Sequence, residues 1–321
     1  MKFPLQAAFP AASRLVYGCM QLGGAWDNTE ISNEQRQRAF AALDAAIDSG
    51  IYCFDHADIY TLGKSEQVFG DYLRQSGCAR EHLFIQSKCG IRLAKDEQPG
   101  YYDFSPAHLE RSVEASLQRL DCDYLDLLLL HRPDPLMEPE RIAEVFNRMQ
   151  QQGKVRAFGV SNMAWPQMKL LQRALEQPLL VNQLEMSLAN YHWLEEGILT
   201  GMPAGSDCHF SAGTVEYCQL EHIQLQAWGS LAQGVFSGGR YPRNDAEQAT
   251  AILVQRLAAA YQVSAEAVVL AWLMRHPAAI QPVIGTTSVR RIQACQQAMQ
   301  VELSREHWYQ LYTAVRAQPL P

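Results

Sequence analysis

The sequence predicts an α/β protein, a (β/α)8 TIM barrel that forms one domain over residues 1–321 and adds an extra C-terminal helix. Three observations lead to this fold class. Eight short apolar runs alternate with amphipathic stretches from one end of the 321-residue chain to the other. No proline-, serine- or glycine-rich linker divides the chain. Eight strand-like runs interleaved with helices favour closure into a barrel over an open sheet.

The apolar runs are the predicted strands. Leu127 to Leu130, four consecutive leucines, is typical of a parallel sheet that is covered on both faces. In chain order the predicted strands are residues 15–19, 51–54, 83–87, 124–130, 155–160, 180–182, 223–227 and 280–284.

The amphipathic stretches between them are the predicted helices. Gly50 marks the end of the first one, and Ser105 followed by Pro106 is a cap-and-proline start for another. Residues 201–213 and 234–243 are expected to be longer loops. The predicted helices are residues 33–49, 64–75, 106–119, 139–152, 165–176, 246–261, 264–275 and 289–299, with 304–316 as the extra C-terminal helix.

Composition excludes several classes of partner. A formal net charge of -7 and scattered basic residues argue against binding to nucleic acid or to a membrane surface. The eight cysteines form no C-x-x-C pair, which favours a reduced, cytoplasmic protein. Pro4 and Pro10 interrupt the N-terminal apolar residues, so we expect neither a signal peptide nor a spanning helix there.

Polar side chains follow the predicted strands one after another. Asp55, Lys88 and His131 stand at the ends of the second, third and fourth strands, and Tyr60 follows Asp55 after a short turn. A parallel barrel has its active site at the carboxyl ends of its strands, so we expect these side chains to converge. Later strand ends carry Ser161, Asn162, Gln183, Trp228, Gly285 and Thr286.

A lysine, a carboxylate, a tyrosine and an imidazole together suit the reduction of a carbonyl. Hydride addition leaves negative charge on the carbonyl oxygen, which needs a proton donor and a fixed electrostatic partner. Free tyrosine has a pKa of about 10, so we expect Lys88 to lower the pKa of Tyr60 while Asp55 keeps Lys88 charged. His131 would orient the carbonyl oxygen. The electrons must come from a cofactor, because none of these side chains is a reductant.

Several short blocks recur in the order of the predicted strands. Phe-Asp55-His-Ala-Asp-Ile-Tyr60, Ser87-Lys88 and Leu-Leu-His131 carry the four candidate catalytic side chains. The further blocks are GKVRAFGVSN, NQ and AWGSLAQG, at residues 153–162, 182–183 and 227–234. With these blocks, residues 18–291 resemble the aldo-keto reductase superfamily, and most closely its bacterial monomer-type, NADP-dependent branch.

The resemblance implies an oxidoreductase that reduces small aldehydes or ketones with NADPH, Tyr60 acting as general acid. It also implies where the nicotinamide lies. Ser161, Asn162 and Gln183 would hold its carboxamide, and Trp228 would stack on its ring. A monomer is the oligomeric state that the resemblance implies.

The same resemblance assigns the rest of the cofactor. Backbone at Met20 would approach the ribose. The pyrophosphate and 2′-phosphate contacts that it implies are Ser230, Leu231, Gly234, Gly285, Thr286 and Arg291.

Some positions depart from the family pattern. His56 stands where threonine is usual, and Trp228 stands where tyrosine is frequent. Gly285-Thr286 replaces a frequent Lys-Ser pair. Without that lysine, the preference for NADPH over NADH rests on Arg291, whose guanidinium can bind a phosphate through two hydrogen bonds.

The same residues also allow simpler interpretations. Asp55 and Lys88 could be an ion pair that braces two strands, although Tyr60 and His131 at matching places favour a site. His56 next to Asp55 suggests a metal site, but strand alternation sends its side chain to the other face, so no metal is expected.

Two other functions remain open from the sequence. A regulatory or sensor subunit could bind the cofactor on the same barrel without turnover. A barrel aldolase could form a Schiff base on Lys88. Substrate identity depends on loops after Ile91 and Tyr191 and at 236–243. The candidate pocket walls are Trp26, Tyr101, Tyr102 and Trp193.

Overall fold

The computed structural model describes residues 3–95 and 97–321. Eight parallel strands close into a barrel in the order β1-β10-β9-β8-β7-β6-β3-β2, so the predicted fold class is confirmed. Each strand coincides with one of the predicted apolar runs. The strands are β1 (Val16–Gly18), β2 (Cys53–Asp55), β3 (Phe84–Cys89), β6 (Leu127–Leu130), β7 (Phe158–Ser161), β8 (Leu179–Glu185), β9 (Gln224–Trp228) and β10 (Gln281–Ile284).

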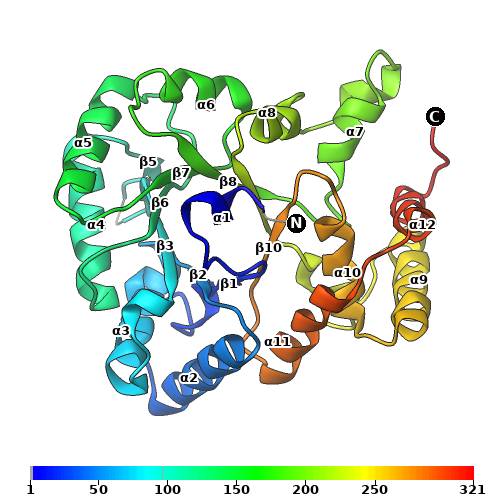
Figure 1. The fold of residues 1–321 in the computed structure, drawn as a ribbon, viewed down its shortest axis with the longest axis horizontal. Coiled ribbons are helices and arrows are strands. Elements are labelled where there is room, and N and C mark those ends of the chain that lie inside the picture. The colour runs from blue at the N-terminus through cyan, green and yellow to red at the C-terminus, as the bar shows by residue number, and fades with distance from the viewer. Residues whose placement is uncertain (1–2, 96) are drawn as a thin grey trace.

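A ring of helices covers the outside of the barrel (Figure 1). The predicted extra helix packs against α9 at the edge of this ring. Among the described residues no helix alone is long and apolar enough to cross a membrane, and α9 with α10 meets that test only as a pair bent by 94°. The predicted helices are found as α2 (Asn33–Asp48), α3 (Lys64–Ser76), α4 (Pro106–Leu120), α5 (Pro139–Gln151), α6 (Trp165–Gln172), α9 (Asp245–Tyr261), α10 (Ala265–Met274), α11 (Val289–Gln296) and α12 (Arg305–Arg316).

Local signals set the ends of these helices. Gly50 has a φ of 74° directly after α2, a left-handed conformation that glycine adopts without steric cost. Pro106 is the first residue of α4, as predicted, but the Ser105 hydroxyl makes no capping bond. The backbone N–H of Ser105 instead donates to Asp103 Oδ1 at 2.9 Å.

Several short elements were not predicted. Each spans two turns or fewer, which is too little for an apolar periodicity to stand out. α7 and α8 belong to the part of the chain where only loops were expected after the sixth strand. These elements are α1 (Leu5–Ala8), the hairpin of β4 (Ile91–Arg92) and β5 (Tyr101–Tyr102), α7 (His192–Ile198) and α8 (Thr214–Leu220).

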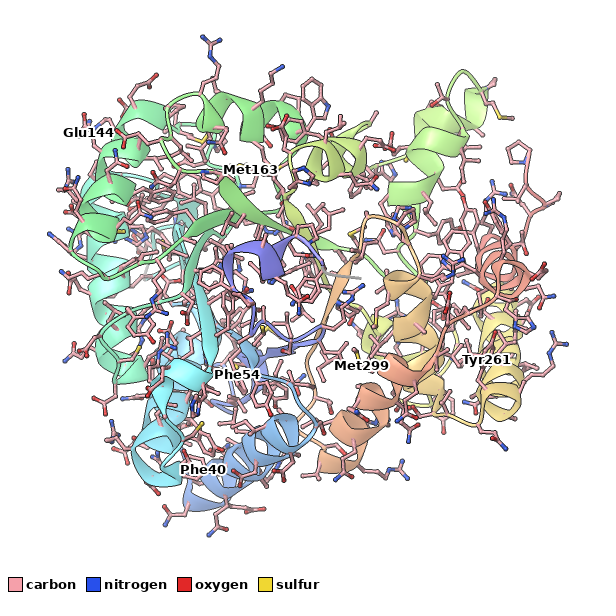
Figure 2. All side chains as sticks on the ribbon, viewed as in Figure 1. Phe40, Phe54, Glu144, Met163, Tyr261 and Met299 are labelled. Atoms are coloured by element: carbon pink, nitrogen blue, oxygen red, sulfur yellow. The ribbon has the colours of Figure 1, made fainter. Side chains whose placement is uncertain are left out.

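Alternation along the strands separates two cores. On β2, Phe54 points outward and packs against Phe69 of α3, with ring centroids 5.1 Å apart. Figure 2 shows Phe54 inside the ring of helices and Glu144 of α5 on its outer edge. Cys53, its neighbour, belongs to a separate apolar cluster inside the barrel.

The N-terminal segment closes one end of the barrel. Phe3 and Leu5 are buried in the same interior cluster as Cys53 and Val181. The backbone N–H of Leu5 donates to Gln224 Oε1 at 3.5 Å. Figure 1 shows α1 over the centre of the barrel. The strand carboxyl ends therefore form the open end.

Candidate active site

The structure brings the four candidate catalytic side chains together at the open end of the barrel. Asp55 ends β2, Lys88 is the next-to-last residue of β3, and His131 follows β6. These three strands are neighbours in the order β6-β3-β2. Tyr60 begins the short 3-10 turn that follows β2.

Lys88 is the centre of the group. Its ammonium donates to Asp55 Oδ2 at 2.8 Å and to Tyr60 Oη at 2.8 Å, and its third donor goes to the backbone carbonyl of His56 at 2.9 Å. The side chain is 1% exposed. All three ammonium protons therefore have acceptors inside the protein, which argues against a free lysine nucleophile and so against the Schiff-base aldolase.

A strained turn presents Tyr60. Thr61 and Leu62, the next two residues, have φ angles of 48° and 60°, and the left-handed region is unfavourable for a β-branched residue such as threonine. The Thr61 hydroxyl donates to the Tyr60 carbonyl at 2.7 Å and shares a hydrogen bond with Ser65 of α3. These bonds hold the turn against its strain.

Burial decides the ionisation of the pair. Burial lowers the pKa of Lys88, but Asp55 and Tyr60 more than offset this, so the pKa lies above its ordinary value. Burial raises the pKa of Tyr60, and Lys88 acts against the rise without cancelling it. Lys88 lowers the pKa of Tyr60 as expected, but the expected net lowering is wrong, because burial outweighs the effect of Lys88. Tyr60 is therefore a protonated phenol at neutral pH.

His131 faces Tyr60 across the site. Their ring centroids lie 5.9 Å apart in an edge-to-face arrangement. Burial, followed by the charges of Lys88 and Arg132, holds the pKa of His131 well below its ordinary value. A neutral imidazole carries one N–H, which suits it to donate a hydrogen bond rather than a proton.

Asp55 is anchored by a network of buried glutamines. Its Oδ1 accepts from Gln86 Nε2 at 2.5 Å and from Gln183 Nε2 at 2.9 Å. Both amides also donate to Gln226 Oε1, and Gln226 Nε2 donates in turn to Gln86 and Gln281. The network spans the barrel interior below the site, and its glutamines are at most 2% exposed.

A cavity of about 610 Å³ opens at this end of the barrel. Every residue predicted for the site lines it except Lys88, which lies behind Asp55 and Tyr60. The volume falls in the range of small-molecule and cofactor pockets. The cavity also has lining residues that were not predicted for the site. They include Gln21, Arg132, Gln233, Ser237 and Glu266.

The side chains expected at the nicotinamide are already ordered by one another. The Ser161 hydroxyl donates to the Gln183 carbonyl at 2.9 Å, and Asn162 Nδ2 donates to Ser161 Oγ at 2.8 Å. Trp228 Nε1 donates to Asn162 Oδ1 at 3.0 Å. Asn162 has a φ of 56°, a conformation that asparagine tolerates better than most residues.

The other end of the cavity is built from a tight loop and Arg291. The Ser230 hydroxyl donates to the Val283 carbonyl at 2.8 Å and ties the loop to β10. Gly234 has a φ of 78°, and a Cβ there would lie 2.8 Å from the Cα of Gly239. A Cβ on Gly239 would lie 2.7 Å from Arg291 Nη1, so the guanidinium packs on this loop. In the described part of the chain no carboxylate pairs with Arg291.

His56 points away from the cavity, as strand alternation predicted. Its ring packs edge-to-face on Phe69 of α3 at 4.6 Å. Neither ring nitrogen has a hydrogen-bond partner within the described residues. Of the candidate pocket walls, Trp193 is buried against Trp272, and none of the four lines the cavity.

Comparison with known proteins identifies the family. The family model described as "Aldo/keto reductase family" matches residues 14–315. The chain is 35% identical to an oxidoreductase of Bacillus subtilis, YcsN, with 96% of each chain covered. It is also 35% identical to a 6-dehydroglucose reductase of Agrobacterium fabrum, over 94% of this chain and 93% of that one.

A solved structure agrees with these sequence matches. It is an aldo/keto reductase from Klebsiella pneumoniae in complex with NADP and acetate, which shares 26% identity and a TM-score of 0.73. The alignment covers 97% of this chain and 93% of that one. From the family match, its near-complete coverage and the barrel itself, we conclude that the chain is an oxidoreductase that belongs to the aldo-keto reductase family.

Proposed function

We propose that this chain reduces aldehydes or ketones to alcohols by hydride transfer from NADPH, with Tyr60 as the general acid. One observation carries the proposal. Lys88 joins Asp55 to Tyr60 through two 2.8 Å hydrogen bonds, and Tyr60 and His131 both face the cavity. The charged amine of Lys88 therefore contacts the phenol of Tyr60, which lines the cavity together with the imidazole of His131.

The cavity has the features that a phosphorylated dinucleotide needs. Tyr60 and His131 line its catalytic end, and Arg291 with the tight loop around Gly234 lines its other end. Bound there, NADPH would supply the hydride. A guanidinium suits the 2′-phosphate, which NADH lacks, so NADPH is the expected cofactor and NADH the weaker one. The Klebsiella pneumoniae relative, described in complex with NADP, supports this choice.

The cofactor contacts are proposed residue by residue. At the nicotinamide end they are Ser161, Asn162, Gln183 and Trp228, whose mutual hydrogen bonds fix their positions. The contacts proposed along the ribose, pyrophosphate and 2′-phosphate are Met20, Ser230, Leu231, Gly234, Gly285, Thr286 and Arg291.

Tyr60 would donate the proton, and its neighbours would stabilise the charge that this leaves. Tyr60 is protonated in the resting site because burial raises its pKa. Its hydroxyl and the N–H of neutral His131 would both donate to the carbonyl oxygen, whose growing negative charge strengthens both bonds. As the proton leaves, Lys88 stabilises the phenolate, and Asp55 keeps Lys88 charged.

Replacing Tyr60 by phenylalanine tests the proposal. Tyr60→Phe removes the acid and leaves the ring, so kcat for reduction of a small aromatic aldehyde should fall by about 100-fold or more. Binding of NADPH, followed by quenching of tryptophan fluorescence, should stay within a few-fold of the wild-type protein. Tyr52→Phe, at an exposed tyrosine outside the cavity, is the matched control and should keep full activity.

Three results would overturn the proposal. One is full activity in Tyr60→Phe with normal cofactor binding. Another is tight NADPH binding without turnover of any of a panel of carbonyls, which would favour the sensor role. The third is quenching by neither NADPH nor NADH. A monomeric state and a cytoplasmic location stay predictions from the sequence.

A further inference from the structure

The catalytic end of the cavity contains a second cation besides Lys88. Arg132 directly follows His131, lines the cavity and is partly buried. Its guanidinium carbon lies 5.8 Å from the ring centroid of Trp228. The side chain therefore lies in the cavity wall near His131 rather than fully out in solvent.

Arg132 has no protein anion to pair with among residues 3–95 and 97–321. No salt bridge or hydrogen bond joins its guanidinium to a carboxylate of the described chain. Asp134, the acid nearest to it in sequence, accepts from the backbone N–H groups of Phe104 and Leu136 at 3.0 and 2.8 Å. Asp55, the acid of the candidate catalytic group, is paired with Lys88.

The charges along the cavity are therefore unevenly distributed. Glu266 and Arg291 are both among its lining residues, and Asp55 neutralises Lys88. Arg132 is left as the uncompensated positive charge near Tyr60 and His131. Desolvating an arginine without an anion is costly, and a ligand that brings the anion recovers that cost.

We propose that Arg132 selects carbonyl substrates that carry a carboxylate. This inference rests on the proposed function, because it assumes that the carbonyl lies against Tyr60 and His131. The planar guanidinium can donate two parallel hydrogen bonds to a carboxylate, and Trp228 supports it from one side. A carboxylate held there fixes the distance between the anion and the reacting carbonyl.

Two aldehydes that differ by one charge and one ester methyl group test the proposal. Wild-type protein should reduce 4-carboxybenzaldehyde with a kcat/KM at least about tenfold above that for methyl 4-formylbenzoate, its neutral ester. The ester is the more electrophilic aldehyde, so intrinsic reactivity alone would give the opposite order. The quantity to report is the acid-to-ester ratio of kcat/KM.

Variants separate charge recognition from packing. Arg132→Met should lower the acid-to-ester ratio at least about tenfold, chiefly through a higher KM for the acid, and Arg132→Lys should restore part of it. Arg256→Met removes an exposed arginine outside the cavity and should keep the wild-type ratio. If Arg132→Met lowers kcat/KM equally for the acid and the ester, the side chain only supports Trp228, and the proposal is wrong.

Binding decides the case even without turnover. Calorimetry on the NADP+-saturated protein should give tighter binding of benzoate than of benzamide, and Arg132→Met should abolish the difference. Two results would overturn the role of Arg132 but not the proposed function. One is turnover of both aldehydes with no preference for the acid, and the other is equal binding of benzoate and benzamide. Absence of any turnover, with the benzoate preference present, would overturn the proposed function and leave Arg132 as a carboxylate site.

Discussion

Two histidines lie close to Lys88, and burial lowers the pKa of both rings, so both are neutral at neutral pH. His131 faces the cavity, where under the proposed function its neutral N–H would donate to a carbonyl oxygen. His56 faces α3, where burial and then Lys88 lower its pKa to about 3. The same lysine charge therefore acts on both rings, but only one of them can reach a ligand.

His56 should make the protein sensitive to acid. The unfolded chain takes up a proton on this ring near pH 6.5, whereas the folded protein does so only near pH 3. Stability is therefore fully present above about pH 6.5 and is lost as pH falls, by up to about 1.4 kcal/mol for each pH unit. His56→Leu should remove this loss, so its free energy of unfolding should exceed that of the wild type increasingly from pH 6.5 to pH 4.

Urea unfolding at several pH values measures the effect. His82→Gln, at an exposed histidine, is the control and should follow the wild-type pH profile. Parallel wild-type and His56→Leu profiles would show that His56 is not the group responsible.

Single residues were predictable where strand order alone places them. Asp55, Lys88 and His131 stand at the carboxyl ends of neighbouring strands, and the barrel rule needs no side-chain detail to bring them together. Arg132 was missed although it follows His131 directly, because its exposure to the cavity depends on loop conformation. The net pKa of Tyr60 was missed because the depth of burial cannot be read from a sequence.

The residues at a helix–helix contact set how closely the two helices approach, and the contact between α3 and α4 contains a glycine. Gly70 of α3 packs on the backbone of Arg119 and Leu120 at the end of α4. A Cβ on Gly70 would lie 2.9 Å from the carbonyl carbon of Leu120, closer than real contacts allow. The atoms in the way belong to the backbone of α4, which cannot rotate out of the contact as a side chain can.

Gly70→Ala should therefore destabilise the protein by about 1–3 kcal/mol, through displacement of α3. Gly197 in α7 has no atom within 4 Å of its built Cβ, so Gly197→Ala should instead stabilise by about 0.5–1 kcal/mol. Urea denaturation of both variants provides the comparison. Equal effects in the two would mean that α3 and α4 are not in rigid contact.

Long helices were predictable and short ones were not. α2 and α9 present four or more turns of amphipathic pattern, with side-chain caps at Ser32 and Asn244. α7 and α8 have seven residues each and owe their form to tertiary packing. Sequence periodicity therefore located the repeat of the barrel but not the insertions around its mouth.

At the scale of the whole molecule, the glutamine network couples the barrel to the site. Gln226 is its hub, bonded to Gln86, Gln183 and Gln281 from three other strands. Polar residues in the middle of buried strands were the available signal, and a search restricted to strand ends passes over them.

Gln226→Leu should leave the side-chain carbonyls of Gln86 and Gln281 without this donor inside the barrel. Each buried acceptor left unpaired costs about 1–3 kcal/mol, so the free energy of unfolding should fall by several times the effect of a surface change. Gln255→Leu, at an exposed glutamine of α9, is the control. Thermal unfolding measures both, and an unchanged midpoint for Gln226→Leu would contradict the role of the network.

Under the proposed function, the closed lower end of the barrel would affect how each catalytic cycle ends. Phe3, Leu5 and their apolar neighbours fill that end, and in the described part of the chain the cavity that Tyr60 lines opens at the mouth. A product alcohol bound against the Tyr60 phenolate would block the access of water to it. The proton on Tyr60 would then be replaced only after the alcohol has left, so product release would be the step that returns Tyr60 to its protonated form.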